Sequence, residues 1–158
     1  IDIRPDGKLA LYEEGFKFLD YAIVSDHSSF RRTQKEQTKR VLAALANPKA
    51  KIFGHPTGRK LNQREGIELN WPEIFEFCKK NDKWLEVNSW YDRLDLPDNL
   101  VREAVKIGVK LIIDTDSHAL DQMSLMKYGV SVARRGWAEK NDVANTLPIA
   151  HFTKEFLG

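Results

Sequence analysis

An aspartate and a histidine, two residue types that commonly bind metal ions, directly follow an apolar segment in the second half of the chain. Residues 109–113 read Val-Lys-Leu-Ile-Ile, a pattern typical of a buried parallel strand, and Asp116 and His118 come just after them. If the extended backbone continues, residues two apart point to the same face, so a carboxylate oxygen and an imidazole nitrogen converge on one ion. Asp116 could equally cap the next helix, with His118 an ordinary residue of its first turn. The spacing alone leaves both interpretations open.

Two further histidines stand in the same position relative to a predicted strand. Residues 19–24 lead into Ser-Asp-His27, and residues 51–54 lead directly into His55-Pro-Thr-Gly-Arg. In proteins built from strand-helix units, ligands gather at the C-terminal ends of the strands. A barrel brings these ends into one ring, whereas an open sheet spreads them out. Because three of the four histidines share this position, the pattern favours a barrel with a metal site at that end.

The rest of the chain alternates predicted strands and helices. We predict strands at residues 19–24, 51–54, 84–87, 109–114 and 129–133. We predict helices at residues 33–46 and 71–80, after residues 95–98 to about residue 107, and at residues 119–127. Gly108 suits the C-cap of the third helix. At least four strand-helix units follow one another, which predicts a parallel α/β arrangement, either part of a barrel or an open sheet.

Length and composition fit one globular domain. The 158 residues are 42% hydrophobic and 30% charged, and the formal net charge of +2 permits a polyanionic partner without requiring one. The single cysteine, Cys78, excludes an internal disulfide, and its apolar neighbours predict a buried thiol rather than a nucleophile. No stretch approaches the roughly 18 apolar residues that span a bilayer, so we expect a cytoplasmic protein without a membrane partner.

The sequence resembles the polymerase and histidinol phosphatase (PHP) domain, a metal-dependent phosphoesterase built as a distorted seven-stranded, TIM-like βα barrel. The matching segments run in family order over nearly the whole chain, at residues 25–27, 54–59, 85–88, 92–96, 114–118 and 133–137. The resemblance is to the PHP domain at the C-terminal end of bacterial family X DNA polymerases in particular. Segments 54–59 and 133–137 are specific to that branch, whereas Asp-x-His is shared by the superfamily.

The resemblance implies a metal centre and a reaction. It makes His27, His55, Asp116 and His118 ligands in a cluster of up to three divalent ions, manganese or zinc. Closely spaced ions generate a hydroxide from water and neutralise charge on a phosphoryl group, so no nucleophilic side chain is needed. The implied substrates are DNA 3′ ends, through a 3′–5′ exonuclease activity, or other phosphate esters. His151 lies beyond the last predicted strand without a partner, and we do not expect it to be a ligand.

Four polar side chains are candidates for contact with the substrate. Arg59, Arg134 and Arg135 could bind phosphate through the guanidinium fork, although arginines near strand ends also form salt bridges. Asn88 could line the pocket or satisfy a loop. Glu86, on the same strand, could be a carboxylate that supports the ligands from behind.

Part of the family pattern has no counterpart in this chain: an opening His-x-His motif, a further Asp and His, and a Glu. We therefore expect residues 1–158 to form a single domain that corresponds to the C-terminal portion of a PHP domain, with the remaining ligands supplied by its N-terminal part or by the polymerase. A partial barrel leaves strand edges unpaired, so residues 1–3 or 130–133 should be open to pairing with that part or in a homodimer. A catalytically silent interaction module and a small-molecule phosphatase of histidinol phosphatase type are the alternatives.

Overall fold

A four-stranded parallel sheet forms the centre of the part of the chain that the computed structural model describes, residues 1–157 apart from the side chains of residues 155 and 157. The strands are β1 (Ala22–Val24), β2 (Ala50–Phe53), β3 (Trp84–Asn88) and β4 (Leu111–Asp114), in this order across the sheet. Leu85 pairs with Leu111 and Asn88 pairs with Asp114. The C-terminal ends of all four strands therefore lie at the same end of the sheet, as the sequence predicted.

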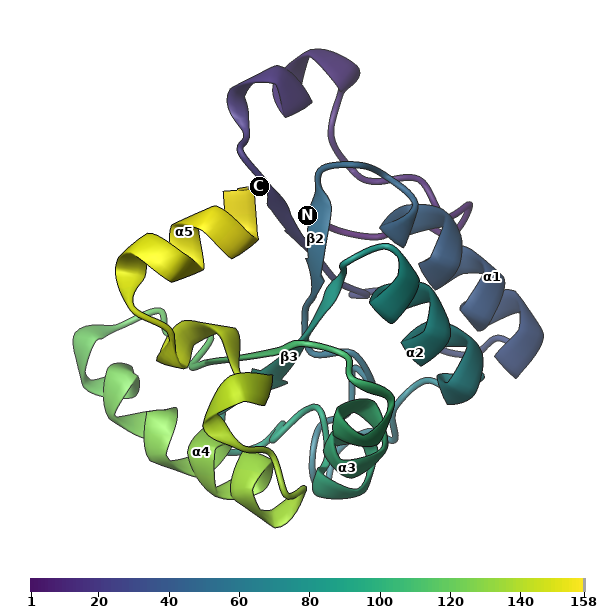
Figure 1. Ribbon diagram of the computed structural model, residues 1–158. Coiled ribbons are helices and arrows are strands. Elements are labelled where there is room, and N and C mark those ends of the chain that lie inside the picture. Colours follow the sequence, from purple (N-terminus) through teal and green to yellow (C-terminus); the bar gives the residue numbers. More distant parts are fainter. Residues whose placement is uncertain (158) are drawn as a thin grey trace.

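Helices surround the strands in Figure 1, with α1 and α2 on one side of β2 and α5 on the other. The α-helices are α1 (Gln34–Leu45), α2 (Trp71–Lys80), α3 (Asp98–Ile107), α4 (Met126–Arg135) and α5 (Ile149–Leu157). Short 3₁₀ helices are η1 (Glu13–Phe18), η2 (Leu120–Leu125), η3 (Lys140–Asp142) and η4 (Ala144–Thr146). This order confirms the predicted parallel α/β arrangement, while closure into a barrel stays a prediction. No helix within residues 1–157 is long and apolar enough to cross a bilayer.

Local sequence sets the ends of two helices where they were predicted. At the start of α1, Thr33 Oγ1 accepts a hydrogen bond from the Glu36 backbone N–H (3.3 Å), and the Glu36 carboxylate accepts one from the Thr33 N–H (3.0 Å). This reciprocal capping box satisfies two backbone donors that the first helical turn leaves free. At the end of α3, Gly108 adopts a left-handed conformation with φ of 89°. A glycine there avoids the steric cost that a side chain would impose.

The main core lies between α1, α2, α3 and one face of the sheet. Its fully buried side chains include Val24, Phe53, Leu85, Leu111, Val41, Ile74 and Val101. Cys78 on α2 belongs to this core, and burial raises the pKa of its thiol to about 12. The prediction that Cys78 is buried is confirmed.

The opposite face of the sheet changes character along the strands. Near the N-terminal end of β3, Trp84 packs against Phe156 of α5, with ring centroids 4.8 Å apart. Because alternate residues of a strand share a face, Glu86 and Asn88 follow Trp84 on this side. The apolar part is thus covered by α5, and the polar part leads to the strand ends where the histidines were predicted.

Residues 129–133 are helical, so the strand predicted there is wrong, whereas the helix predicted over residues 119–127 is confirmed in part. The 3₁₀ helix η2 occupies Leu120–Leu125, and α4 begins at Met126. The β-branched Val130 and Val132 suggested a strand, but the buried positions Gly129, Val132 and Ala133 have helical spacing. Gly129 permits the packing, because a Cβ added there would lie 2.0 Å from Ser89 Oγ.

Both edges of the sheet are covered within residues 1–157, contrary to the expectation of open edges. Asp2 bridges Ser25 beside β1, and Leu9 pairs with Ile3 on the outer side. At the other edge Val143 bridges Leu111, and the Asn145 side chain accepts from Ile113 N–H (3.2 Å) and donates to Ile113 C=O (2.6 Å). Short covered edges resist pairing with other chains. Unpaired strand edges therefore no longer support a homodimer, and a homodimer stays a prediction.

Candidate functional site

His27 and His55 lie side by side where β1 and β2 end. Their Nε2 atoms are 3.2 Å apart, and the ring centroids are 4.9 Å apart with the planes inclined by 72°. Nδ1 of His27 lies 2.6 Å from the carboxylate Oδ1 of Asp2. The sequence predicted that the two histidines meet, but it did not single out Asp2. The alternation in Ile1-Asp2-Ile3, typical of a strand, was the only available signal.

The contact with Asp2 determines which nitrogen of His27 could bind a cation. Because a carboxylate accepts hydrogen bonds, Nδ1 of His27 carries the proton and Nε2 presents its lone pair toward His55. A carboxylate behind a histidine in this way is the usual support of a histidine metal ligand. Two imidazole nitrogens bound to one tetrahedral ion lie roughly 3.4 Å apart, given nitrogen–zinc distances of about 2.0–2.1 Å. The observed separation of 3.2 Å is close to that value, so the pair fits a metal ion.

His55 is held neutral and in an uncommon backbone conformation. Burial, and then the charge of Arg93, lowers the pKa of His55 to about 4. Its φ is 29°, its backbone N–H donates to the Glu86 carboxylate, and its buried Nδ1 has no hydrogen-bond partner among the described residues. A neutral imidazole is the form that binds metals, and backbone strain of this kind clusters at functional sites.

Two carboxyl groups on neighbouring strands lie close to each other, and one of them contacts the backbone of His55. Glu86 of β3 is buried, and its pKa is raised by burial and then by the charge of Asp114 on β4. Burial also raises the pKa of Asp114, and one of its carboxylate oxygens, Oδ1, has no hydrogen-bond partner in the described part of the chain. Since Glu86 binds the backbone of His55, it supports the histidine as the sequence suggested.

The Asp116 and His118 segment differs from both interpretations of the sequence. Strand β4 ends at Asp114, and Asp116 has φ of 51°, so extended geometry does not continue to His118. Asp116 is not a helix cap either, because η2 begins only at Leu120. Aspartate tolerates the left-handed region better than most residues, which permits the sharp turn. Nδ1 of His118 donates to the backbone carbonyl of Asp116 (2.7 Å), which leaves Nε2 with a lone pair.

Arg93 connects Asp116 with the histidine pair. Its Nε lies 3.6 Å from Asp116 Oδ2, and the charges of both residues act on the pKa of His55. Within residues 1–157 no hydrogen bond, ion pair or ring contact joins His118 to either histidine of the pair. Nor do three or more His, Cys, Asp or Glu side chains in that range form a group spaced to hold an ion. A site shared by all four predicted ligands therefore stays a prediction.

Asp95 organises the loop that carries His55. Its buried carboxylate accepts hydrogen bonds from the backbone N–H groups of Thr57 (3.0 Å) and Gly58 (2.8 Å). Burial raises the pKa of Asp95 to about 6. Arg59 also joins this loop to the next one, because its Nε donates to the Arg93 carbonyl (2.8 Å). Asp95 was missed as a site residue, although it lies in a segment that carried the family resemblance.

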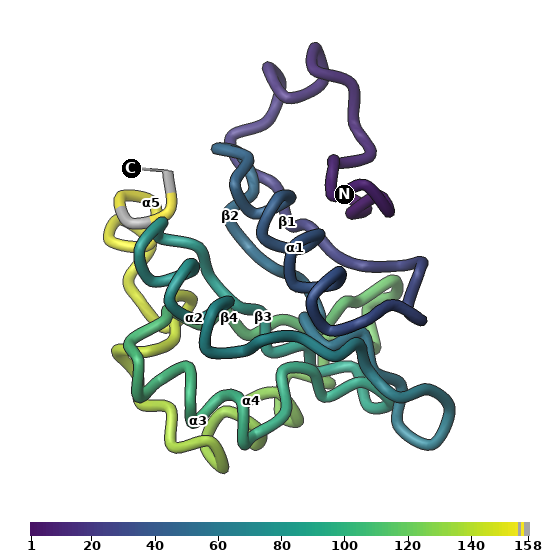
Figure 2. Tube along the Cα trace, turned by 90° about the vertical axis from the view of Figure 1, so that its right-hand side faces the viewer, coloured from purple at the N-terminus to yellow at the C-terminus, as the bar shows by residue number. Residues whose placement is uncertain are grey.

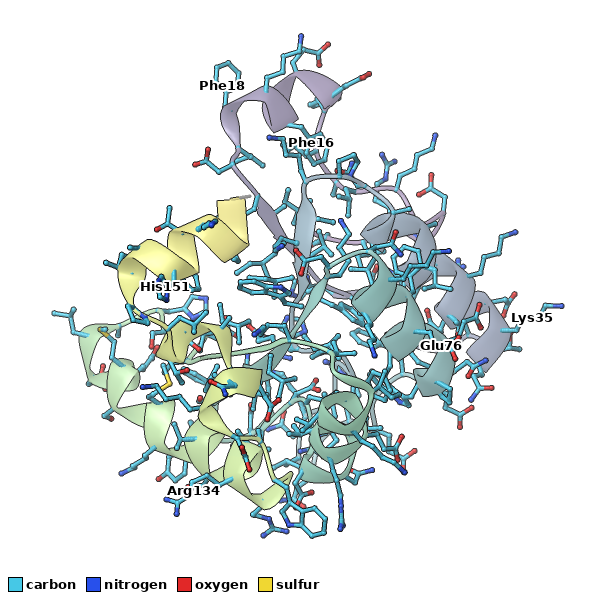
Figure 3. All side chains as sticks on the ribbon, in the orientation of Figure 1. Phe16, Phe18, Lys35, Glu76, Arg134 and His151 are labelled. Atoms are coloured by element: carbon cyan, nitrogen blue, oxygen red, sulfur yellow. The ribbon has the colours of Figure 1, made fainter. Side chains whose placement is uncertain are left out.

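The candidate substrate contacts lie in different surroundings. Asn88 is fully buried and accepts a hydrogen bond from the Trp90 N–H (2.9 Å). Nε of Arg135 lies 2.7 Å from Asp98 Oδ2 at the start of α3, and Arg134 is exposed near the end of α4, at the periphery in Figure 3. Both arginines lie in α4 rather than at the end of a strand. The exposed His151 lies on α5. Contact of Asn88, Arg59, Arg134 or Arg135 with a substrate stays a prediction.

The chain is similar in sequence to a DNA polymerase and to probable phosphatases. No protein-family profile matches the chain. The chain is 38% identical, over 145 residues or 92% of its length, to "DNA polymerase/3'-5' exonuclease PolX" of Bacillus subtilis. It is a homologue of PolX. It is also 28% identical over 120 residues to a probable phosphatase of Caldicellulosiruptor bescii, and 25% identical over 150 residues to one of a Thermoanaerobacter species.

The chain is short relative to these proteins. The similarity covers 72% and 89% of this chain in the comparisons with the two phosphatases. It spans 25% of the length of PolX, and 48% and 59% of the lengths of the phosphatases. The activities of the full-length relatives therefore do not by themselves show what this chain does.

Proposed function

We propose that this chain is the C-terminal portion of a PHP domain that hydrolyses phosphoesters with divalent metal ions, acting on DNA 3′ ends. The observation that carries the proposal is the histidine pair, His27 and His55, with Nε2 atoms 3.2 Å apart and His27 held by Asp2. The names of the homologues, PolX with its 3′–5′ exonuclease and the probable phosphatases, support the reaction class.

The metal ligands in this proposal are His27, His55, Asp116 and His118. Imidazole and carboxylate groups suit Mn²⁺ or Zn²⁺, and up to three ions would be bound once the N-terminal part of the domain or the polymerase adds its ligands. Bound ions supply a hydroxide and neutralise charge on the phosphoryl group.

The side chains around the ligands position them. Asp2 keeps a proton of His27 on Nδ1, so that Nε2 is the nitrogen that would bind the ion. Glu86 fixes the His55 backbone through its N–H. Arg93 holds a positive charge beside Asp116, where it would attract a phosphate oxygen. These contacts preorganise the site before substrate arrives.

A nuclease assay with matched variants tests the proposal. A 5′-labelled DNA oligonucleotide is incubated with Mn²⁺ or Zn²⁺, with and without EDTA, and with the chain either alone or together with the N-terminal part of the domain. We expect little hydrolysis by the chain alone, because part of the ligand set is missing. Metal-dependent shortening from the 3′ end is expected once the N-terminal part is added to the wild type or to His151→Ala, and its loss is expected for His27→Ala and His55→Ala. Circular dichroism confirms that the variants fold. Equal activity in all four proteins with the N-terminal part present would overturn the site, and absence of hydrolysis in the wild type under that condition would favour a catalytically silent interaction module.

A small-molecule phosphatase is the second candidate, because two homologues carry the name probable phosphatase. The same proteins are assayed with p-nitrophenyl phosphate and histidinol phosphate. Faster metal-dependent turnover of these esters than of the oligonucleotide would favour that alternative.

A further inference from the structure

We propose that a basic hollow beside the histidine pair, lined by residues 29–32 and 59–66, binds backbone phosphates of single-stranded DNA next to its reacting end. The inference rests on the proposed function and deepens it, because it assigns the path of the substrate strand. The hollow consists of two cavities of 810 and 460 Å³ that share Arg64, Glu65 and Gly66. The shared wall makes them one continuous surface.

The hollow is built from the same two loops that carry the histidines. Arg31 follows His27 by four residues, and Arg59 follows His55 by four. The loops also touch, because a Cβ added to Gly58 would lie 2.9 Å from the Phe30 ring. Within the second loop, the Gly58 N–H donates to the His55 carbonyl (2.8 Å). Both loops lie on the right-hand side of the molecule in Figure 2. A strand bound in the hollow would therefore pass close to the histidine pair.

Positive charge is concentrated there. The lining contains five basic side chains and one acidic side chain, Glu65, which gives a local excess of four positive charges. The entire chain has a formal net charge of only +2. The remainder of the chain is therefore net acidic, and a polyanion is attracted to this face rather than to the surface at large.

Part of this charge is free to meet a ligand. Arg64 stacks on Phe30, 3.9 Å from the ring centroid, and Arg32 donates to the Pro5 carbonyl (2.9 Å). The side chains of Arg31 and Lys60, by contrast, form no hydrogen bond or ion pair with the described residues. Two cations without a protein partner beside a hollow are suited to phosphate oxygens.

An aromatic pair borders the loop of residues 59–66. The Leu61 N–H donates to the Asp92 carbonyl (2.5 Å), next to Tyr91, which is 61% exposed. Tyr91 stacks on Trp90 with ring centroids 5.4 Å apart. Basic grooves combined with exposed aromatic rings bind single strands, because every base has a face that stacks. This combination favours a DNA strand over a small phosphate ester as the occupant.

The test measures DNA binding without metal. Fluorescence anisotropy of labelled oligothymidylate is followed in EDTA over a series of salt concentrations. The double variant Arg31→Gln/Lys60→Gln is compared with Lys35→Gln/Lys39→Gln, which removes the same charge from exposed positions of α1. Loss of two phosphate contacts should reduce the slope of log K against log salt by about 1.4, at about 0.7 per contact on single strands. The α1 variant should keep the wild-type slope.

Further readouts separate this inference from the proposed function. Tyr91→Ala should weaken oligonucleotide binding about fivefold at every salt concentration, the loss of one stacked base. Selective loss of DNA binding supports the hollow even if no ester is hydrolysed, in which case only the proposed function fails. No DNA binding by the wild type, or equal losses in both double variants, overturns the hollow.

Discussion

The β1–β2 side of the candidate site and the β4 side differ in how firmly their side chains are held. On the first side, His55 is buried and His27 is bound to Asp2. On the second, Asp116 is about one-third exposed, and His118 is exposed. Among the described residues, His118 forms hydrogen bonds with Asp116 and Gln122 and a ring contact with Trp90. The buried carboxylate of Glu86 holds the backbone of His55, and Asp2 holds the side chain of His27, whereas a turn outside the sheet carries Asp116 and His118.

The difference teaches which sequence signal was the more reliable. The Asp-x-His spacing was the most conspicuous motif, yet its extended geometry is absent, because β4 ends at Asp114. The two histidines that stood alone in the sequence are the ones in contact. Position after a parallel strand predicted proximity better than a short spacing did, because strand ends are fixed by hydrogen bonds on both sides.

The largest expected effect tests whether the β1–β2 side dominates metal binding. His55→Ala should lower the affinity for Mn²⁺ or Zn²⁺ more than about 100-fold, because even residues that only support a ligand account for about 10–100-fold. His118→Ala should cost less, since its loop holds it less firmly. Isothermal titration calorimetry on folded variants measures both. A larger loss for His118→Ala would reverse the comparison.

Asp95, which holds the β2 loop, should make stability depend on pH. Burial raises its pKa from 3.8 to about 6, so the native state binds the proton more tightly than the unfolded chain. Its contribution is therefore fully present below about pH 4 and is lost as pH rises to about 6, a change on the order of 3 kcal/mol.

Urea unfolding at pH 4, 5, 6 and 7 checks this for the wild type, Asp95→Asn and the exposed control Asp20→Asn. The free energy of unfolding of the wild type relative to Asp95→Asn should fall between pH 4 and pH 6 and then level off. A constant difference would show that Asp95 has an ordinary pKa.

Removal of the carboxylate behind His27 should have a smaller effect. Asp2→Asn is expected to lower metal affinity about tenfold, near the lower end of the range for such residues, because Asp2 is 60% exposed. The matched control is Asp20→Asn, an exposed aspartate elsewhere. Calorimetric titrations that give the same affinity for both variants would remove Asp2 from the site.

The smallest expected effect concerns the β4 side. Asp116→Asn removes a charged ligand and should weaken metal binding by several-fold to about tenfold, whereas His151→Ala, on α5, should not change it. Titration with Mn²⁺ or Zn²⁺ measures the two variants side by side. Equal losses would count against Asp116 as a ligand.

The sequence by itself determined the parallel strand-helix order, the ends of α1 and α3, and the burial of Cys78. These features depend on local causes: a capping box at Thr33, the left-handed Gly108, and the apolar pattern of each element. It also placed His27 and His55 after their strands, which the structure confirms.

Only the tertiary structure decided the conformation of residues 129–133, the covering of the sheet edges and the partners of the histidines. Valines favour strands in isolation, but close packing of Gly129 against Ser89 stabilises a helix there. Asp2 and His27 are 25 residues apart, and Glu86 meets Asp114 only because β3 and β4 are neighbours in register. Contacts between distant segments depend on register and loop geometry, and the side-chain pattern of a single segment does not contain that information.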